Sequence, residues 1–171
     1  MNVQRLTLTA ICIAIVTVFV AYIPFPTVVG GYNHPGAVAE VFIAVAFGPI
    51  VGGIAAGVGA LIADLILAPQ FAIMTLIAHG IMGFLIGYFG WRKGQWNKII
   101  GLILGGLALA VIYYIGEIVI LGLRPVEAAA EIIPNLFQVA LGLLGLLLYE
   151  LVKRAYPQID QLAGKPAFQE R

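Results

Sequence analysis

Long apolar segments follow one another along this chain, separated by short stretches that contain proline, glycine or charge. Between these interruptions the pattern predicts six helices: Arg5–Ile23, Ala37–Phe47, Ile50–Leu67, Phe71–Gly90, Ile99–Leu121 and Ile132–Leu151. A helix needs about 20 apolar residues to cross the ~30 Å hydrocarbon core of a bilayer. All but the second segment come close to that length, so we expect helices that span a membrane.

The second segment, 37–47, is too short to cross alone, because it extends only about 16 Å at ~1.5 Å per residue. Gly48-Pro49 is typical of a turn, and a full-length segment starts at Ile50. The predicted fold class is therefore all-α, a six-transmembrane-helix bundle in which a short helix is joined tightly to a long one. We expect residues 1–171 to form a single integral membrane domain with a cytoplasmic tail at 152–171.

Composition supports this class. Hydrophobic residues make up 62% of the chain and charged residues 10%, which is too little polar surface for a water-soluble core. The first apolar segment has no small-residue cleavage site before Pro24, so it is expected to be a retained helix rather than a signal peptide.

The positions of lysine and arginine predict the orientation, because loops rich in these residues stay in the cytoplasm. With six crossings, both termini share one side of the membrane. Eight of the nine basic residues fall on that side, and only Arg124 falls opposite: Arg5, Arg92, Lys93, Lys98, Lys153, Arg154, Lys165 and Arg171. Both termini are therefore expected in the cytoplasm.

Polar side chains gather in the outer halves of the predicted helices. They are Glu40, Asp64, Tyr113, Glu117, Asn135 and Gln138, with His79 near the middle of its helix. The inner halves of the second, third and fifth helices carry no charged or amide side chain. Ionisable groups in a bilayer normally face a cavity or one another, so this asymmetry predicts a pocket open to the outside rather than a continuous channel.

Helical spacing sharpens that expectation. Asn135 and Gln138 are three residues apart and share a face, and Tyr113 and Glu117 are four apart. In the outer loop Pro24–Pro35, three hydrogen-bonding residues follow the pair Gly30-Gly31, namely Tyr32, Asn33 and His34. The loop is either a lid over the pocket or a plain turn with an interfacial tyrosine. Each polar residue alone could equally make an ordinary contact between helices.

Small residues predict helix contacts. Ala10 and Ala14 form one pair spaced by four, and Gly53 and Gly57 form another. The glycine pair is expected to pack within the bundle. The alanine pair, on the terminal helix, is a possible docking face for another protein.

Several chemistries are missing from the sequence. It contains no phosphate-binding GxxxxGK[ST] loop, no His/Cys cluster for a metal and no carboxylate pair at catalytic spacing, so no cofactor or catalytic residue is predicted. The protein is therefore not expected to be an enzyme. ATP hydrolysis, if it drives transport, must reside in a partner.

Four stretches together resemble a known family over nearly the whole chain. They are LTLTAICIAI with its two alanines, FGPIVGG leading into a glycine-rich helix that ends in Ala63-Asp64, TLIAHGIMGFLIGYF, and PNLFQ at Pro134–Gln138. The chain resembles the substrate-binding S component of energy-coupling factor (ECF) vitamin transporters, of the riboflavin, hydroxymethylpyrimidine or pyridoxine type.

This resemblance implies a prokaryotic plasma-membrane protein that binds a vitamin outside. It would dock on a transmembrane coupling protein that carries two cytoplasmic ATPase subunits. In the family, the small-residue face of the first helix contacts the coupling protein, which transfers to Ala10 and Ala14. The substrate site transfers to Tyr32, Asn33, His79, Glu117, Asn135 and Gln138, and Tyr113 joins them through its helical spacing with Glu117.

Two observations bear on which vitamin is bound. Riboflavin-binding members often carry a lysine in the segment that matches Thr75–Gly83, where this chain has His79. Glu40, Asp64 and Glu117 disfavour an anionic vitamin. We therefore expect a small neutral or weakly basic heteroaromatic ring such as pyridoxine or hydroxymethylpyrimidine.

Two other functions compete with this one. A stand-alone secondary transporter driven by protons through His79 and Asp64 would need polar groups in the inner half as well. A membrane-embedded enzyme with Glu117 or His79 as acid or base would need an accompanying nucleophile or metal.

Overall fold

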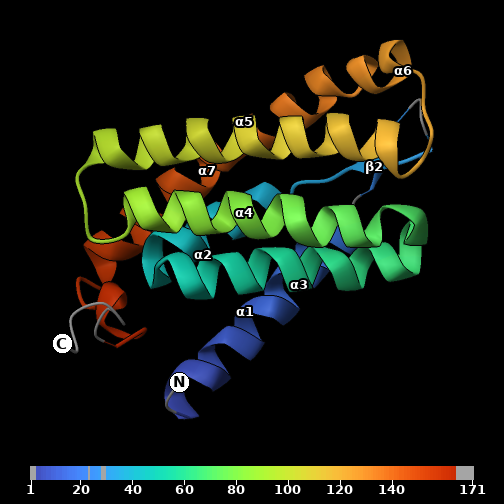
Figure 1. Cartoon of the computed structure of the whole chain (residues 1–171). Coiled ribbons are helices and arrows are strands. Elements are labelled where there is room, and N and C mark those ends of the chain that lie inside the picture. Colours follow the sequence, from blue (N-terminus) through green and yellow to red (C-terminus); the bar gives the residue numbers. More distant parts are fainter. Residues whose placement is uncertain (1–2, 23, 28–29, 165–171) are drawn as a thin grey trace, which may run out of the picture.

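A computed structural model describes residues 3–22, 24–27 and 30–164. Its elements in chain order are α1 (Val3–Tyr22), β1 (Phe25–Pro26), β2 (Tyr32–Asn33), α2 (Gly36–Phe47), α3 (Pro49–Leu67), η1 (Pro69–Phe71), α4 (Ala72–Gly90), α5 (Gln95–Val119), α6 (Pro125–Ala130), α7 (Ile132–Ala155) and η2 (Ile159–Gln161). The long helices form a bundle from which the first half of α1 slopes away (Figure 1).

Each predicted apolar segment is a helix, with small differences at the ends. Helix α5 begins four residues early, at Gln95, and α7 continues to Ala155. Both extensions contain charged residues, which sequence reasoning placed outside the bilayer. Lys98, in the extension of α5, forms a salt bridge with Glu150 near the end of α7, so the polar start of α5 contacts the end of α7.

Among the described residues, five helical spans are long and apolar enough to cross a membrane, and α2 is a shorter apolar helix. This agrees with a multi-pass membrane protein, while six crossings and cytoplasmic termini stay predictions. Helix α2 is almost wholly buried and packs against α1, α3, α4 and α7. It is rich in alanine and valine, so neighbouring helices can approach it closely.

The α2–α3 turn depends on glycine. Gly48 has a φ of +89°, a left-handed conformation that disfavours any side chain, and Pro49 then begins α3. The GPI sequence therefore joins the short helix tightly to the long one, as predicted.

The predicted glycine pair on α3 lies against α4, so its intramolecular role is confirmed. A Cβ atom at Gly57 would lie 2.8 Å from the carbonyl oxygen of Leu76, and one at Gly53 would lie 3.1 Å from that of Gly80. Figure 1 shows α3 and α4 side by side along their length. Glycine allows this approach because no side chain separates the backbones.

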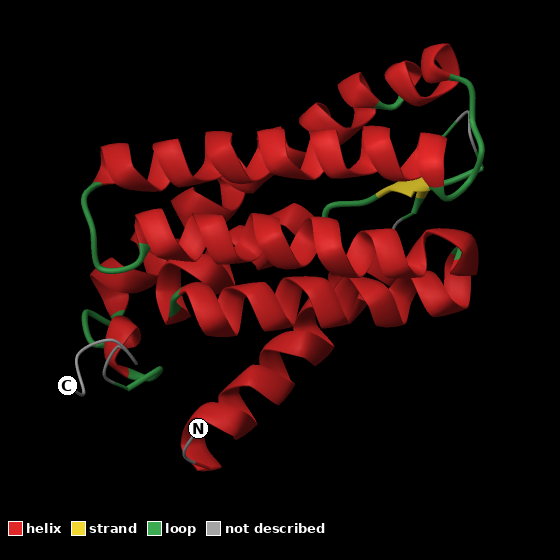
Figure 2. Cartoon of the chain, viewed as in Figure 1, coloured by secondary structure: helices red, strands yellow, loops and turns green. Residues whose placement is uncertain are grey.

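A short hairpin interrupts the otherwise helical chain. Strands β1 and β2 pair antiparallel, with Phe25 opposite Asn33 and Pro26 opposite Tyr32. The strands are coloured yellow in Figure 2. They are a difference from the all-α prediction. Val28 and Val29 in its loop, and Ile23 before it, lie outside the described residues.

The end of α7 folds back against the bundle. Within the predicted tail, residues 152–155 are still helical, and Asp160 then accepts a hydrogen bond from Tyr149 at 2.8 Å and pairs with Lys153 at 2.6 Å. Arg92 of the α4–α5 connection donates to the backbone oxygen of Asp160 at 2.8 Å. Lys165 and Arg171, which entered the charge prediction, lie outside the described residues.

Candidate functional site

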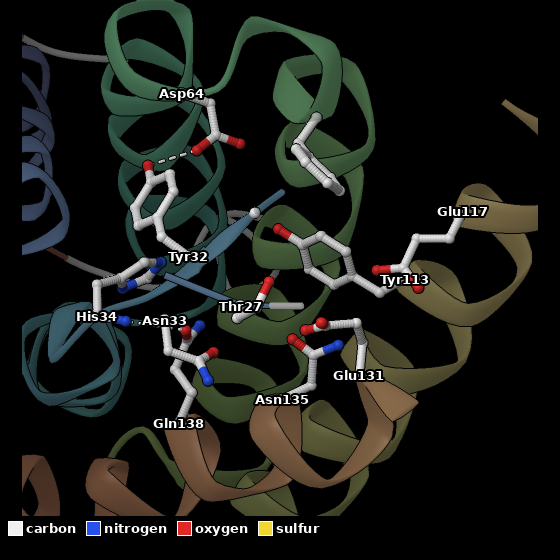
Figure 3. A pocket seen from close by; sticks show the side chains of 12 residues that line it. Thr27, Tyr32, Asn33, His34, Asp64, Tyr113, Glu117, Glu131, Asn135 and Gln138 are labelled. Atoms are coloured by element: carbon white, nitrogen blue, oxygen red, sulfur yellow. Dashed lines mark hydrogen bonds between the residues drawn. The ribbon is translucent and has the colours of Figure 1, made fainter. Parts of the chain in front are cut away.

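One polar cavity of about 30 Å³ lies at the end of the bundle that carries the hairpin. Twelve residues line it: Thr27, Gly31, Tyr32, Asn33, His34, Asp64, Phe71, Tyr113, Glu117, Glu131, Asn135 and Gln138 (Figure 3). A larger hollow between α5 and α7 is lined by aliphatic side chains and offers nothing to orient a polar ligand.

Four parts of the chain build the cavity. The hairpin and the residues after it provide one wall, and the end of α3 with η1 provides Asp64 and Phe71. The last turns of α5 and the start of α7 provide the remaining side chains. These parts meet because the chain reverses at this end of the bundle, between α3 and α4 and between α5 and α7.

A hydrogen bond ties the hairpin to α3. The Tyr32 hydroxyl donates to Oδ1 of Asp64 over 2.5 Å. Burial, together with this bond, raises the pKa of Tyr32 well above its usual value, so the phenol stays protonated and keeps its donor. The hairpin is therefore held over the cavity by a side chain that also lines it.

His34 connects the hairpin to α7 and α2. Its backbone N–H donates to Oε1 of Gln138 at 3.3 Å, and its Nδ1 accepts from the backbone N–H of Gly36 at 3.1 Å. Burial, with the neighbouring His79, lowers the pKa of His34 well below its usual value. The ring is thus neutral and carries its proton on Nε2.

A second polar layer lies behind the cavity wall. Nδ1 of His79 lies 2.9 Å from Oε1 of Glu40, and both side chains are fully buried. The His79 ring contacts the rings of His34 and Tyr113, at centroid distances of 5.5 and 6.1 Å. The Tyr113 hydroxyl also forms a 2.6 Å hydrogen bond with Thr75. This layer supports the groups that line the cavity.

The charge of the lining is acidic. Asp64, Glu117 and Glu131 contribute carboxyl groups, and none of the described lining residues is lysine or arginine. Phe71 and the two tyrosines add aromatic faces. The arrangement suits a small aromatic ligand with hydrogen-bond donors and disfavours an anion.

Residues 1–154 match a family model described as "ECF-type riboflavin transporter, S component". The chain belongs to this family. S components of ECF transporters are membrane-embedded and work with an energy-coupling module, and they are transporter subunits rather than enzymes.

One relative matches most of the length of this S component. An uncharacterized protein of Pyrococcus woesei, described only by its position in a gap 3′ region, is 35% identical over 148 residues, which are 85% of this chain and 98% of the relative. The match therefore covers nearly the complete relative.

Two solved structures share the fold. One, reported as the structure and mechanism of the S component of a bacterial ECF transporter, has a TM-score of 0.71 at 18% identity and covers 89% of this chain and 96% of its own. The other, FolT bound with folic acid, has a TM-score of 0.60 at 21% identity, with coverages of 90% and 97%. At these identities the likeness establishes the architecture of the S component alone.

Six of the seven side chains that the sequence singled out for substrate line the one cavity: Tyr32, Asn33, Tyr113, Glu117, Asn135 and Gln138. The seventh, His79, is not among the lining residues and lies in the supporting layer. Their contact with substrate stays a prediction.

Three lining residues, Thr27, Phe71 and Glu131, were not predicted from the sequence, and Gly31, His34 and Asp64 were considered there without being included in the site. Glu131 could have been found, because Glu131, Asn135 and Gln138 follow the i, i+4, i+7 spacing of one helical face. Glu131 was not predicted because the sixth predicted helix begins at Ile132, one residue later. Phe71 gave no such signal, since an aromatic residue beside Pro69 is equally typical of packing.

Ala10 and Ala14 of the S component are both exposed on α1. The side of α1 that packs on the bundle instead contains Cys12, Val16 and Val20. The alanine pair therefore lies away from the fold's own contacts.

Proposed function

We propose that this S component binds a small nitrogen-heterocyclic vitamin or vitamin precursor from outside the cell and delivers it inward with an energy-coupling module. The observation that carries the proposal is the convergence of six predicted polar and aromatic side chains on one cavity at a single end of the bundle. Pyridoxine, hydroxymethylpyrimidine and riboflavin are the compounds to test.

The lining supports this choice of chemistry. The described lining residues offer three carboxyl groups, three side-chain amides and three phenyl or phenol rings, but no lysine or arginine. A neutral or weakly basic heteroaromatic ring would find aromatic faces and acceptors for its N–H groups. An anionic vitamin would meet carboxylates with no counter-charge from the lining.

The coupling module would contact the protein at the end opposite the cavity and along α1. We place both termini in the cytoplasm, with Ala10 and Ala14 facing a transmembrane coupling protein that carries two cytoplasmic ATPase subunits. Figure 1 shows the start of α1 and the end of the described chain on the side away from the hairpin. This arrangement would leave the cavity open to the outside.

Mass spectrometry of the small molecule that copurifies with the protein tests the substrate class directly. Binding of that molecule should weaken at least about tenfold in Gln138→Ala and in Glu117→Ala, because each loses a hydrogen-bonding group from the cavity. Gln4→Ala and Glu127→Ala are the matched controls, since both residues lie outside the lining. Unchanged affinity in both cavity variants, with the protein still folded, would refute the site.

A further inference from the structure

Several polar groups around the cavity already have partners within the protein. Asp64 accepts from Tyr32, Gln138 accepts from the His34 backbone, and Tyr113 pairs with Thr75. Among the described lining residues, three buried side-chain atoms lack a hydrogen-bond partner: the Thr27 hydroxyl, Oε2 of Glu117 and Oε1 of Glu131. Two of these three atoms are carboxyl oxygens.

The two glutamates are deeply buried for charged residues. Glu117 is 2% exposed and Glu131 is 4% exposed. Buried carboxylates normally find a cation or several donors, because an unpaired buried charge is strongly destabilising. Figure 3 shows both side chains directed at the same part of the cavity, beside Tyr113 and Asn135.

The surrounding backbone does not neutralise this pair. Glu117 lies in the last turn of α5, where the helix dipole disfavours a negative charge. Glu131 lies at the start of α7, where the dipole favours one. Two carboxylates that line one cavity also repel each other. The carboxyl groups of Glu117 and Glu131 therefore lack a positive charge or N–H donors at this corner of the cavity.

A metal ion does not fit this demand. Within the part of the chain that the structure describes, no group of three or more His, Cys, Asp or Glu side chains could hold one. The neighbouring Asn135 amide and Thr27 hydroxyl suit a ligand with several polar atoms on an aromatic frame.

We infer that Glu117 and Glu131 form a subsite for an amino group, and that the preferred ligand is a nitrogen heterocycle with an exocyclic amino or aminomethyl substituent. The inference rests on the proposed function and narrows its substrate class. The amine donates to the two unpartnered carboxyl oxygens, while the ring lies against the aromatic residues of the cavity.

Two matched pairs of probes test the subsite. Pyridoxamine carries an aminomethyl group where pyridoxine carries hydroxymethyl, and hydroxymethylpyrimidine can be compared in its amino and oxo forms. We expect the purified wild-type protein to bind the amine-bearing member of at least one pair at least about tenfold more tightly, since hydrogen bonds to charged groups are worth that much. Isothermal titration or thermal-shift titration in detergent measures the ratio.

Variants then show whether the two glutamates cause the preference for the amine-bearing probe. In Glu117→Gln, Glu131→Gln and the double variant, side-chain shape is kept and charge is lost, so the affinity ratio within that pair should fall toward 1. Glu127→Gln is the matched control, because Glu127 lies on the neighbouring α6, pairs with Arg124 and does not line the cavity. It should leave the ratio unchanged.

The outcomes separate the two proposals. If neutral members bind the wild type and neither pair shows an amine preference, the subsite is wrong and the proposed function stands. A preference that survives in the glutamine variants also overturns the subsite. If no probe binds and no small molecule copurifies, the proposed function fails, and the inference fails with it. The affinity ratio within each probe pair is measured on the wild-type protein, so this part of the test does not depend on whether a variant folds.

Discussion

Glu40 and His79 show how single buried residues support the cavity from behind. Their side chains are fully buried and meet over 2.9 Å, while Oε2 of Glu40 and Nε2 of His79 have no partner. Neither residue is among those lining the cavity. Their contact joins α2 to α4 directly behind the cavity rings.

Removing this contact should destabilise the protein. We expect Glu40→Ala to lower the free energy of unfolding by about 1–3 kcal/mol, because it leaves a buried imidazole without its partner. Glu40→Gln should cost less, since the amide can still bond to the ring. Thermal unfolding in detergent measures the effect, with Gln4→Ala at an exposed position of α1 as control. Equal melting temperatures for wild type and Glu40→Ala would contradict this prediction.

His34 should make stability depend on pH. Its pKa is lowered in the folded protein by burial and by His79, below the value of 6.5 that it has when exposed. Below about pH 6.5 the unfolded chain therefore binds a proton that the folded chain excludes, so stability falls as the pH drops toward the folded pKa and is fully present above pH 6.5.

The variant His34→Asn tests this dependence. Asparagine can accept the Gly36 N–H bond without titrating. The fall in melting temperature between about pH 7.5 and 5 should be smaller in the variant than in the wild type. Parallel curves for the two proteins would rule out His34 as the titrating group.

At the scale of elements, glycine decides how closely helices approach. A Cβ at Gly57 would lie 2.8 Å from the Leu76 carbonyl oxygen and 3.1 Å from Cα of Gly80. Both atoms belong to the α4 backbone, which cannot move aside as a flexible side chain would. The α3–α4 contact in turn positions Asp64 and Phe71 in the cavity.

We therefore expect Gly57→Ala to separate α3 from α4 and to cost about 1–3 kcal/mol of unfolding free energy through overpacking. The control is Gly94→Ala before α5, because a Cβ there meets no atom within 4 Å. Thermal unfolding compares the two variants. If Gly57→Ala were as stable as Gly94→Ala, then α3 and α4 could move apart without a decrease in the free energy of unfolding, which would contradict this prediction.

At the scale of the whole molecule, the protein has two chemically different ends. The hairpin end holds the acidic cavity, whereas the opposite end carries contacts such as Lys98 with Glu150 and Lys153 with Asp160. Between them the exposed side chains are largely aliphatic. Helix α1 lies at the side of the bundle, so a partner can reach it without disturbing the cavity.

Substitutions on α1 should separate docking from binding. Ala10→Trp and Ala14→Trp are expected to reduce copurification of the coupling protein at least about tenfold, because a bulky ring prevents close helix approach. Vitamin binding by the isolated protein should stay unchanged. Ile15→Trp is the control, since Ile15 is also exposed but lies about 100° around the helix from Ala14. Loss of vitamin binding in the alanine variants would argue against a separate docking face.

The chain alone determined the membrane class, the six apolar helices, the Gly48-Pro49 turn and six residues of the cavity lining. Apolar run length and helical spacing are local properties, so they can be read directly from the sequence. Only the tertiary structure decided that His79 lies behind the wall with Glu40, that a hairpin bonded to Asp64 forms one side, and that Glu131 lines the same cavity as Glu117. Those facts depend on which helix faces contact each other, and that is decided by packing among residues far apart in the chain.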